Sequence, residues 1–191
     1  MQIGLLGERQ RMNAALVLAA LSPRYGASAD SLNVTHQACR RGLKRVFWPG
    51  RFQVLTFGRR TVILDGAHNV EAMGELLKTL ASSPWARRRL VFIVGVLRDK
   101  DVRGSARLLS ARPRSRFVAV RPPSPRALEA EDLASELRLQ APRAWVRAEP
   151  DVASALRGWL KDSRPATAVV CGSFTLVGRA LGVLPALGFR R

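Results

Sequence analysis

The chain has 191 residues, 47% of them hydrophobic, which is enough for one complete domain and part of a second. No apolar run reaches the length that spans a bilayer, and Glu8, Arg9 and Arg11 interrupt the start of the chain, where a secretory signal would be apolar. We therefore expect a cytoplasmic protein without a membrane segment. The two cysteines and two histidines are too few and too far apart to indicate a metal site.

The net charge of +18 suggests nucleic acid as a binding partner. However, only four of the 32 basic residues are lysines, and the arginines are scattered over predicted helices, loops and both termini. A nucleic-acid groove instead gathers its basic residues in one stripe with aromatic residues between them. We do not expect nucleic-acid binding to be the main function, although a basic, non-catalytic nucleic-acid module stays as an alternative.

Two helices are predicted in the first part of the chain. The first covers residues 10–21, with Leu16 and Val17 on one apolar face, and the second covers residues 31–42. A Pro-Gly pair closes residues 44–50 and indicates a turn. We interpret the two helices as the end of a preceding domain and residues 44–50 as the crossing to the next one.

Strand-like and helix-like segments alternate after residue 50. A hairpin is predicted from strands at residues 52–57 and 61–64, with its turn at residues 58–60. Later strands are predicted at residues 90–94, 117–120, 144–146 and 168–171, and helices at residues 69–81, 102–111, 126–139, 151–160 and 174–184. This order predicts an α/β fold with a mainly parallel sheet covered on both faces and an antiparallel edge formed by the hairpin.

Polar residues follow the second strand of the hairpin, in the sequence LDGAHN at residues 64–69. They include Asp65, His68 and Asn69. The carboxyl ends of strands are where α/β folds bind ligands, so these residues are candidates for a site. The alternative interpretation is that Asp65 and Asn69 only cap a helix and that His68 is a surface residue.

Six motifs occur in one order along nearly the whole chain. They are LLGERQRMNAALVLAAL (residues 5–21), WPGRF (48–52), LDGAHN (64–69), GVLRDKD (95–101), PRALEAEDLA (125–134) and CGSFTLVGRAL (171–181). In this order and at these distances, the set resembles the C-terminal half of the bacterial folylpolyglutamate synthase/dihydrofolate synthase family, a branch of the Mur ligases. One departure is Arg9, where that family usually carries a histidine.

The resemblance implies a domain division and a reaction in folate metabolism. Residues 1–44 would be the last helices of an incomplete central ATPase domain, and residues 45–191 a Rossmann-like Mur ligase C-terminal domain. The family uses ATP and Mg²⁺ to phosphorylate a carboxylate of folate or dihydropteroate, and the amino group of glutamate then attacks the acyl phosphate. A Mur-type ligase acting on another acid would have similar ATP contacts, and stays as an alternative.

The chain has no G-x-x-x-x-G-K-[ST] loop, the element that cradles phosphates and helps to hold magnesium. In the family that loop, with the expected Mg²⁺ ligands, lies in the N-terminal domain. The chain is therefore expected to be a fragment or a truncated paralogue that is inactive alone.

Three residues match family positions that contact ATP. Arg51 would meet the nucleotide, Asp65 would accept hydrogen bonds from the ribose, and Asn13 would lie near the adenine. A planar guanidinium binds phosphate oxygens in pairs, which suits Arg51 to this role. The alternatives are a surface arginine at a turn for Arg51 and a mid-helix residue facing water for Asn13.

Two further residues, His68 and Ser173, match positions near the incoming glutamate. Each can donate or accept a hydrogen bond. The alternatives are a histidine at a helix start and a serine N-cap, and Ser173 could serve as both cap and ligand contact. Lys100 is interpreted as structural or electrostatic. No catalytic residue and no metal ligand is assigned.

Overall fold

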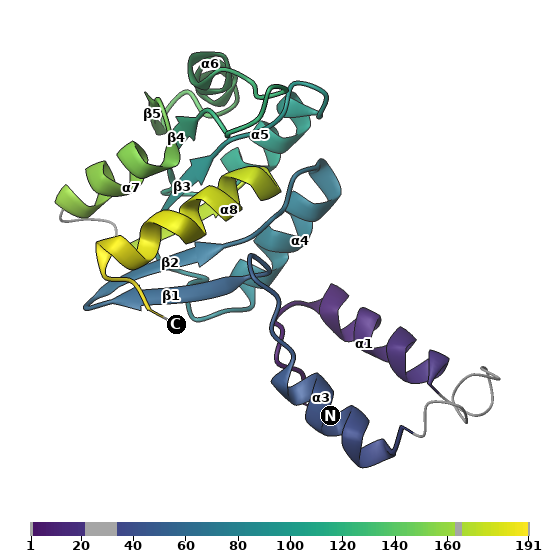
Figure 1. The fold of residues 1–191 in the computed structure, drawn as a ribbon. Helices are drawn as coiled ribbons and strands as arrows, with labels where there is room; N and C mark the ends of the chain where they lie inside the picture. The colour runs from purple at the N-terminus through teal and green to yellow at the C-terminus, as the bar shows by residue number, and fades with distance from the viewer. Residues whose placement is uncertain (1, 22–33, 163–165, 191) are drawn as a thin grey trace.

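The computed structural model describes residues 2–21, 34–162 and 166–190, and an α/β domain makes up most of it (Figure 1). Its strands are β1 (Gln53–Phe57), β2 (Arg60–Leu64), β3 (Leu90–Val94), β4 (Arg116–Val120), β5 (Trp145–Glu149) and β6 (Thr167–Cys171). Its helices are α4 (Val70–Ala81), α5 (Val102–Ser110), α6 (Ala130–Gln140), α7 (Val152–Lys161), α8 (Phe174–Val183) and the 3₁₀ turn η1 (Leu184–Leu187). In the described part of the chain, two helices precede this domain, α1 (Glu8–Ala20) and α3 (His36–Arg45).

The six strands form one sheet in the order β1-β2-β6-β3-β4-β5. The pair β1–β2 is antiparallel, and the other four neighbouring pairs are parallel. The predicted α/β fold, with a mainly parallel sheet and an antiparallel edge hairpin, is confirmed. The parallel order places the carboxyl ends of β2, β6, β3, β4 and β5 at one edge of the sheet and their amino ends at the opposite edge.

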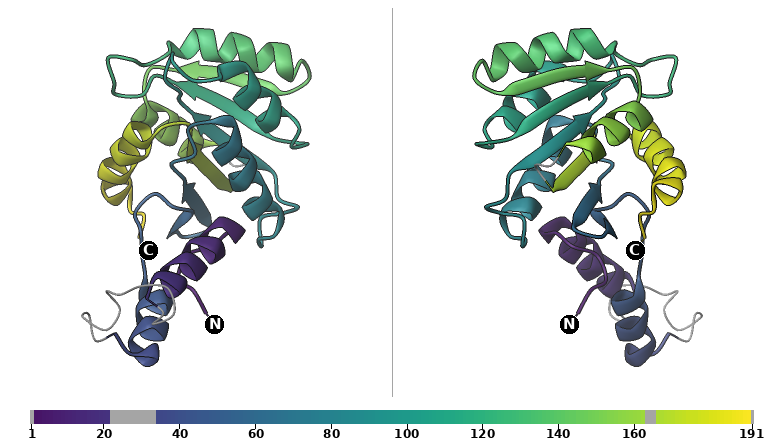
Figure 2. Two further views of the ribbon diagram at one scale, coloured as in Figure 1. Left: turned by 90° about the vertical axis from the view of Figure 1, so that its right-hand side faces the viewer. Right: turned by 90° about the vertical axis from the view of Figure 1, so that its left-hand side faces the viewer.

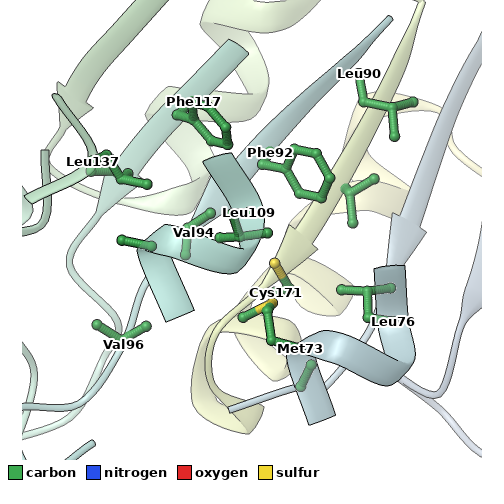
Figure 3. Packing of buried hydrophobic residues seen from close by; sticks show 14 of the residues in the cluster. Met73, Leu76, Leu90, Phe92, Val94, Val96, Leu109, Phe117, Leu137 and Cys171 are labelled. Carbon is green, nitrogen blue, oxygen red and sulfur yellow. The ribbon is translucent and has the colours of Figure 1, made fainter. Parts of the chain in front are cut away.

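Each face of the sheet has its own apolar core, because successive side chains of a strand point to opposite faces. On one face Phe92 packs with α4, α5 and α6, including Met73 and Leu109 (Figure 3). On the other face Ile93 packs with α7 and α8, including Leu156. Figure 2 shows helices on both sides of the sheet, so the domain has three layers.

Several predicted boundaries move for local reasons. Helix α6 begins at Ala130 rather than at residue 126, since residues 126–128 are held in extended contact with the loop after β3. Arg98 N–H donates to the Arg126 carbonyl at 2.9 Å, and Leu128 N–H donates to the Val96 carbonyl at 3.0 Å. Sequence periodicity does not register such a contact between distant segments.

Two other segments also differ in length from their predictions. Helix α3 begins at His36, capped by the Thr35 hydroxyl, and runs past Gly42 to Arg45, while residues 31–33 of its predicted start lie outside the described residues. In the hairpin, Phe57 pairs with Arg60, so Arg60 begins β2 and the turn has only two residues.

Helices α1 and α3 lie outside the three layers of the sheet domain (Figures 1 and 2). Ala14 is the buried residue of α1, whereas Met12, Leu16 and Val17 are 63%, 67% and 48% exposed. Leu16 and Val17, which were predicted to lie on the apolar face of this helix, therefore contact little of the described chain. Among the described residues, every helix is too short or too polar to cross a bilayer.

Candidate functional site

Asp65 follows β2 directly, at the carboxyl edge of the sheet, and joins the two strands of the hairpin. One carboxylate oxygen accepts the Phe52 N–H and the other accepts the Ala67 N–H, both at 2.9 Å. Burial raises the pKa of Asp65, and these two N–H bonds and the charge of Arg51 offset the rise only in part. The carboxylate therefore fixes the loop before β1 against the loop after β2.

Arg51 lies in the turn that leads into β1. Its N–H donates to the Trp48 carbonyl at 3.2 Å, and the neighbouring Gly50 carbonyl accepts the Gly66 N–H at 2.8 Å. Gly50 and Phe52 have positive φ angles of 71° and 41°. A positive φ angle is unfavourable for a non-glycine residue such as Phe52, and the hydrogen bond from its N–H to Asp65 offsets this cost. This tight turn brings Arg51 to the loop that contains Asp65.

The aromatic ring of Phe174, the first residue of α8, lies between Arg51 and His68. The guanidinium carbon of Arg51 is 5.1 Å from the ring centroid, and the His68 ring centroid is also 5.1 Å away. The Nδ1 atom of His68 lies 2.9 Å from the Gly66 carbonyl oxygen. A carbonyl only accepts, so Nδ1 carries a proton and Nε2 is left for another partner. Phe174 is 47% exposed.

Ser173 is the N-cap of α8 and is buried. Its hydroxyl accepts the Leu176 N–H at 3.1 Å and lies 3.1 Å from the Thr175 hydroxyl. Before it, Gly172 has a φ of 111° and donates its N–H to the Ala67 carbonyl at 2.8 Å. The turn after β6 is therefore bonded to the turn after β2, and Ser173 lies in the same loop cluster as Asp65.

Asn13 is not in this cluster. It is exposed on α1, where its side-chain amide donates to Gln10 at 3.3 Å. One turn earlier on the same helix, Arg9 forms an ion pair with Glu71 in the first turn of α4. The structure thus brings together four of the five predicted site residues and places Asn13 apart from them. Lys100 pairs with its neighbour Asp99 at 3.1 Å.

Residues 50–174 match the family described as Mur ligase, glutamate ligase domain. The chain belongs to this family. The resemblance predicted from the six motifs is confirmed, and it covers a C-terminal portion of folylpolyglutamate synthase/dihydrofolate synthase.

Individual relatives agree with this assignment. The dihydrofolate synthase/folylpolyglutamate synthase of Escherichia coli K12 is 32% identical over 175 residues, which are 91% of this chain and 38% of that enzyme. The structure of Escherichia coli FolC in complex with DHPP and ADP is 30% identical, with a TM-score of 0.76 over 92% of this chain and 39% of that one. The Yersinia pestis enzyme complexed with AMPPNP and Mn ion is 32% identical, with a TM-score of 0.72 over 91% of this chain and 38% of that one. The chain spans less than half the length of each.

The loop cluster offers this Mur ligase domain several polar groups for a ligand. Arg51 supplies a positive charge, His68 a free ring nitrogen, and Asp65 the lone pairs that its backbone bonds leave unused. These groups suit a nucleotide with hydroxyl and phosphate groups. Among the described residues, no group of three His, Cys, Asp or Glu side chains could hold a metal ion.

Sequence reasoning missed two members of the cluster. The sequence predicts Phe174 only as the start of a helix, although its ring contacts both Arg51 and His68. Gly66 passes so close to this ring that an added Cβ would lie 2.2 Å from a Phe174 carbon. The available signal was an aromatic residue directly after a strand-end Gly-Ser pair, but nothing in the sequence indicated which loop it would meet.

Proposed function

We propose that the chain is the C-terminal portion of an ATP-dependent ligase that adds glutamate to folate or dihydropteroate through an acyl phosphate. The observation that carries the proposal is the convergence of Arg51, Asp65, His68 and Ser173 around Phe174, at the ligand-binding edge of the sheet. Membership of the glutamate ligase family, and relatives crystallised with ADP, AMPPNP or DHPP, support it.

On the nucleotide side, Arg51 and Asp65 act as one unit. Transfer of a phosphoryl group depends mainly on positioning and charge neutralisation, which a guanidinium provides. Arg51 is held by its backbone and by the Phe174 ring, so that its charge can meet ATP from this domain. Asp65 then accepts the ribose hydroxyls with its remaining lone pairs.

On the glutamate side, His68 contributes Nε2 and Ser173 its hydroxyl proton. A carboxylate of glutamate only accepts, so the Ser173 hydroxyl contacts it by donating its proton while its oxygen still accepts the Leu176 N–H of α8. The amino terminus of α8 also favours a carboxylate nearby, because its first backbone N–H groups point toward the same loop cluster.

The remaining parts of the machinery are placed in a preceding segment. We assign α1 and α3 to the central ATPase domain, since the exposed Met12, Leu16 and Val17 offer an apolar surface to the rest of such a domain. The phosphate-binding loop, the Mg²⁺ ligands and the completion of the Asn13 contact belong to it. The 191-residue chain alone is therefore inactive, and measurable glutamate addition by the purified chain would contradict this assignment.

The test is a fusion protein in which the P-loop portion of a related synthase precedes the chain. Arg51→Ala removes a charge-assisted contact and should slow turnover by about ten- to hundredfold, equivalent to about 1.5–3 kcal/mol. Asp65→Ala should mainly raise the ATP concentration needed for half-maximal rate. Arg59→Ala, an exposed arginine in the hairpin turn, is the matched control and should change neither. Normal rate and ATP dependence in both site variants would remove the nucleotide role from this cluster.

A further inference from the structure

A second concave surface lies at the opposite, amino edge of the sheet. It is a pocket of about 600 Å³ between the starts of β3, β4 and β5 and the ends of α5 and α6. Five arginines line it: Arg89, Arg112, Arg114, Arg116 and Arg143. The strands that separate it from the loop cluster are parallel, so the two sites lie at opposite ends of the same sheet.

The charge in this pocket is poorly compensated. None of the described residues that line it is acidic. Arg116 pairs with Asp162 at 2.6 Å, from outside the pocket lining. In the described part of the chain, Arg89, Arg114 and Arg143 form no ion pair, and Arg112 donates only to carbonyl oxygens, among them those of Trp85 and Ala86 at 2.8 and 2.9 Å. Among the described residues, the pocket lining therefore gathers five arginines and no carboxylate.

Three buried polar atoms in the same pocket lack a hydrogen-bond partner among the described residues. They are the hydroxyl oxygens of Ser110 and Ser115 and the Nε of Arg112, all from residues of the pocket lining. Ser115 is only 7% exposed. Buried polar groups are nearly always paired, because a buried group without a partner loses the hydrogen bonds that it would make to water. All three can donate a hydrogen bond, which suits an acceptor with several oxygens.

The backbone here is also held in a conformation that costs energy. Arg114 has a φ of 59°, in the left-handed region that non-glycine residues seldom adopt. This residue stands between Arg112 and Ser115, in the turn that leads from α5 into β4. Strained residues of this kind cluster at ligand sites.

We propose that this pocket binds a small anion carrying two or more phosphate groups. Guanidinium forks match the geometry of phosphate oxygens, and the two serine hydroxyls and the Arg112 Nε supply neutral and charged donors around them. A volume of about 600 Å³ is within the range of small-molecule sites. A nucleic-acid strand fits less well, because its bases need successive exposed aromatic residues to stack on. Trp145 is the one exposed aromatic residue of the pocket lining, and Arg116 lies 5.5 Å from its ring centroid.

The proposal is independent of the ligase assignment. A ligand in this pocket touches none of Arg51, Asp65, His68 or Ser173, so its binding does not compete with a nucleotide at the loop cluster. Failure of one assignment therefore leaves the other standing.

Isothermal titration calorimetry of the 191-residue chain with sodium tripolyphosphate tests the proposal. We expect one site per chain. The double change Arg114→Gln and Arg143→Gln should raise Kd by about tenfold or more, since each removes a charged donor without touching the core. Ser115→Ala should raise Kd by about three- to tenfold through loss of one hydrogen bond. The matched control, Arg59→Gln with Arg179→Gln, removes the same net charge from exposed positions outside the pocket and should change Kd by less than about twofold.

Three results would overturn the proposal. Equal weakening by the pocket and control pairs would show attraction to the overall charge of +18 rather than to a site. Citrate binding as tightly as tripolyphosphate would show that carboxylates, and not phosphates, are the ligand class. Single-stranded DNA that displaces tripolyphosphate and loses affinity with the pocket pair would assign the surface to nucleic acid instead.

Discussion

The polar side chains at the two edges of the sheet differ in how they are hydrogen-bonded. At the carboxyl edge, Asp65 accepts two backbone N–H groups and Ser173 accepts one, and the two turns that Asp65 joins carry Arg51 and His68. At the amino edge, Ser115 and Ser110 are buried without a described partner beside a group of arginines. At the carboxyl edge, polar side chains form hydrogen bonds to the protein's own backbone, and the polar groups that remain are the ones offered to a ligand. At the amino edge, the two serine hydroxyls have no described hydrogen-bond partner, and the positive charge of the arginines around them is poorly compensated.

This contrast predicts that the carboxyl edge tolerates substitution least at Gly172. Its φ is 111°, and an added Cβ would lie 2.5 Å from the Gly95 carbonyl oxygen, which is backbone and cannot move aside. Gly172→Ala should lower the free energy of unfolding by about 4 kcal/mol, from backbone strain and overpacking together. Urea unfolding measures the change. Gly178→Ala, inside α8 with open space around it, is the control and should stabilise the protein by up to about 1 kcal/mol. Equal effects would mean that the turn after β6 is not rigid.

A smaller effect is expected at Asp65, because asparagine keeps one acceptor oxygen. Asp65→Asn leaves one of the two N–H groups without its acceptor and should cost about 1–2 kcal/mol at pH 7. The raised folded-state pKa of Asp65 sets the pH dependence. The stability linked to this proton is complete below the ordinary aspartate value of about 4 and is lost as the pH rises through the folded-state pKa. The difference between the native protein and Asp65→Asn should therefore grow on acidification through that window.

Asp151 is a control for that pH series, because its pKa is shifted in the opposite direction. Its bond from the Ser154 N–H lowers the pKa of Asp151, so its contribution is present above the ordinary value and is lost as the pH falls through the lowered one. The advantage of the native protein over Asp151→Asn should shrink on acidification. Chemical unfolding across the acidic range compares the two, and a common direction would contradict the cause assigned to Asp65.

The smallest expected effect compares one serine from each edge. Ser115→Ala removes a buried hydroxyl without a described partner and should leave stability unchanged or raise it by up to about 1 kcal/mol. Ser173→Ala removes the N-cap of α8 and should cost about 1 kcal/mol. Thermal unfolding of the two variants measures this sign difference. If Ser115→Ala lost as much stability as Ser173→Ala, the Ser115 hydroxyl would already have a hydrogen-bond partner. The two edges would then not differ in how their serines are paired.

Most of the fold could be predicted from the sequence because it is encoded locally. The continuous apolar runs at β3 and β6 indicated buried parallel strands, and the three-to-four spacing of Met73, Leu76 and Leu80 indicated α4. Boundaries were wrong where a distant segment decides them, as at α6, whose first predicted turn is held by the loop after β3.

The candidate site was only partly predictable. Asp65, His68 and Ser173 follow strands, so their position at the carboxyl edge follows from the strand pattern alone. Hairpin pairing also predicts that Arg51 and Asp65 lie close together, and the Asp65 bond to Phe52 agrees with this. The sequence could not indicate Phe174 between Arg51 and His68, since that arrangement depends on which turns are bonded to each other.

The sequence by itself determined the α/β class, the mainly parallel sheet and the family, because hydrophobic period and motif order are properties of the chain. Tertiary structure alone decided which polar groups are paired. Ser115 and Ser173 are both serines beside a strand or helix end, yet one is an N-cap and the other has no described partner. It also decided that Leu16 and Val17 stay exposed and that dispersed arginines meet in one pocket. Burial and pairing depend on distances between residues far apart in the chain, and sequence periodicity does not contain those distances.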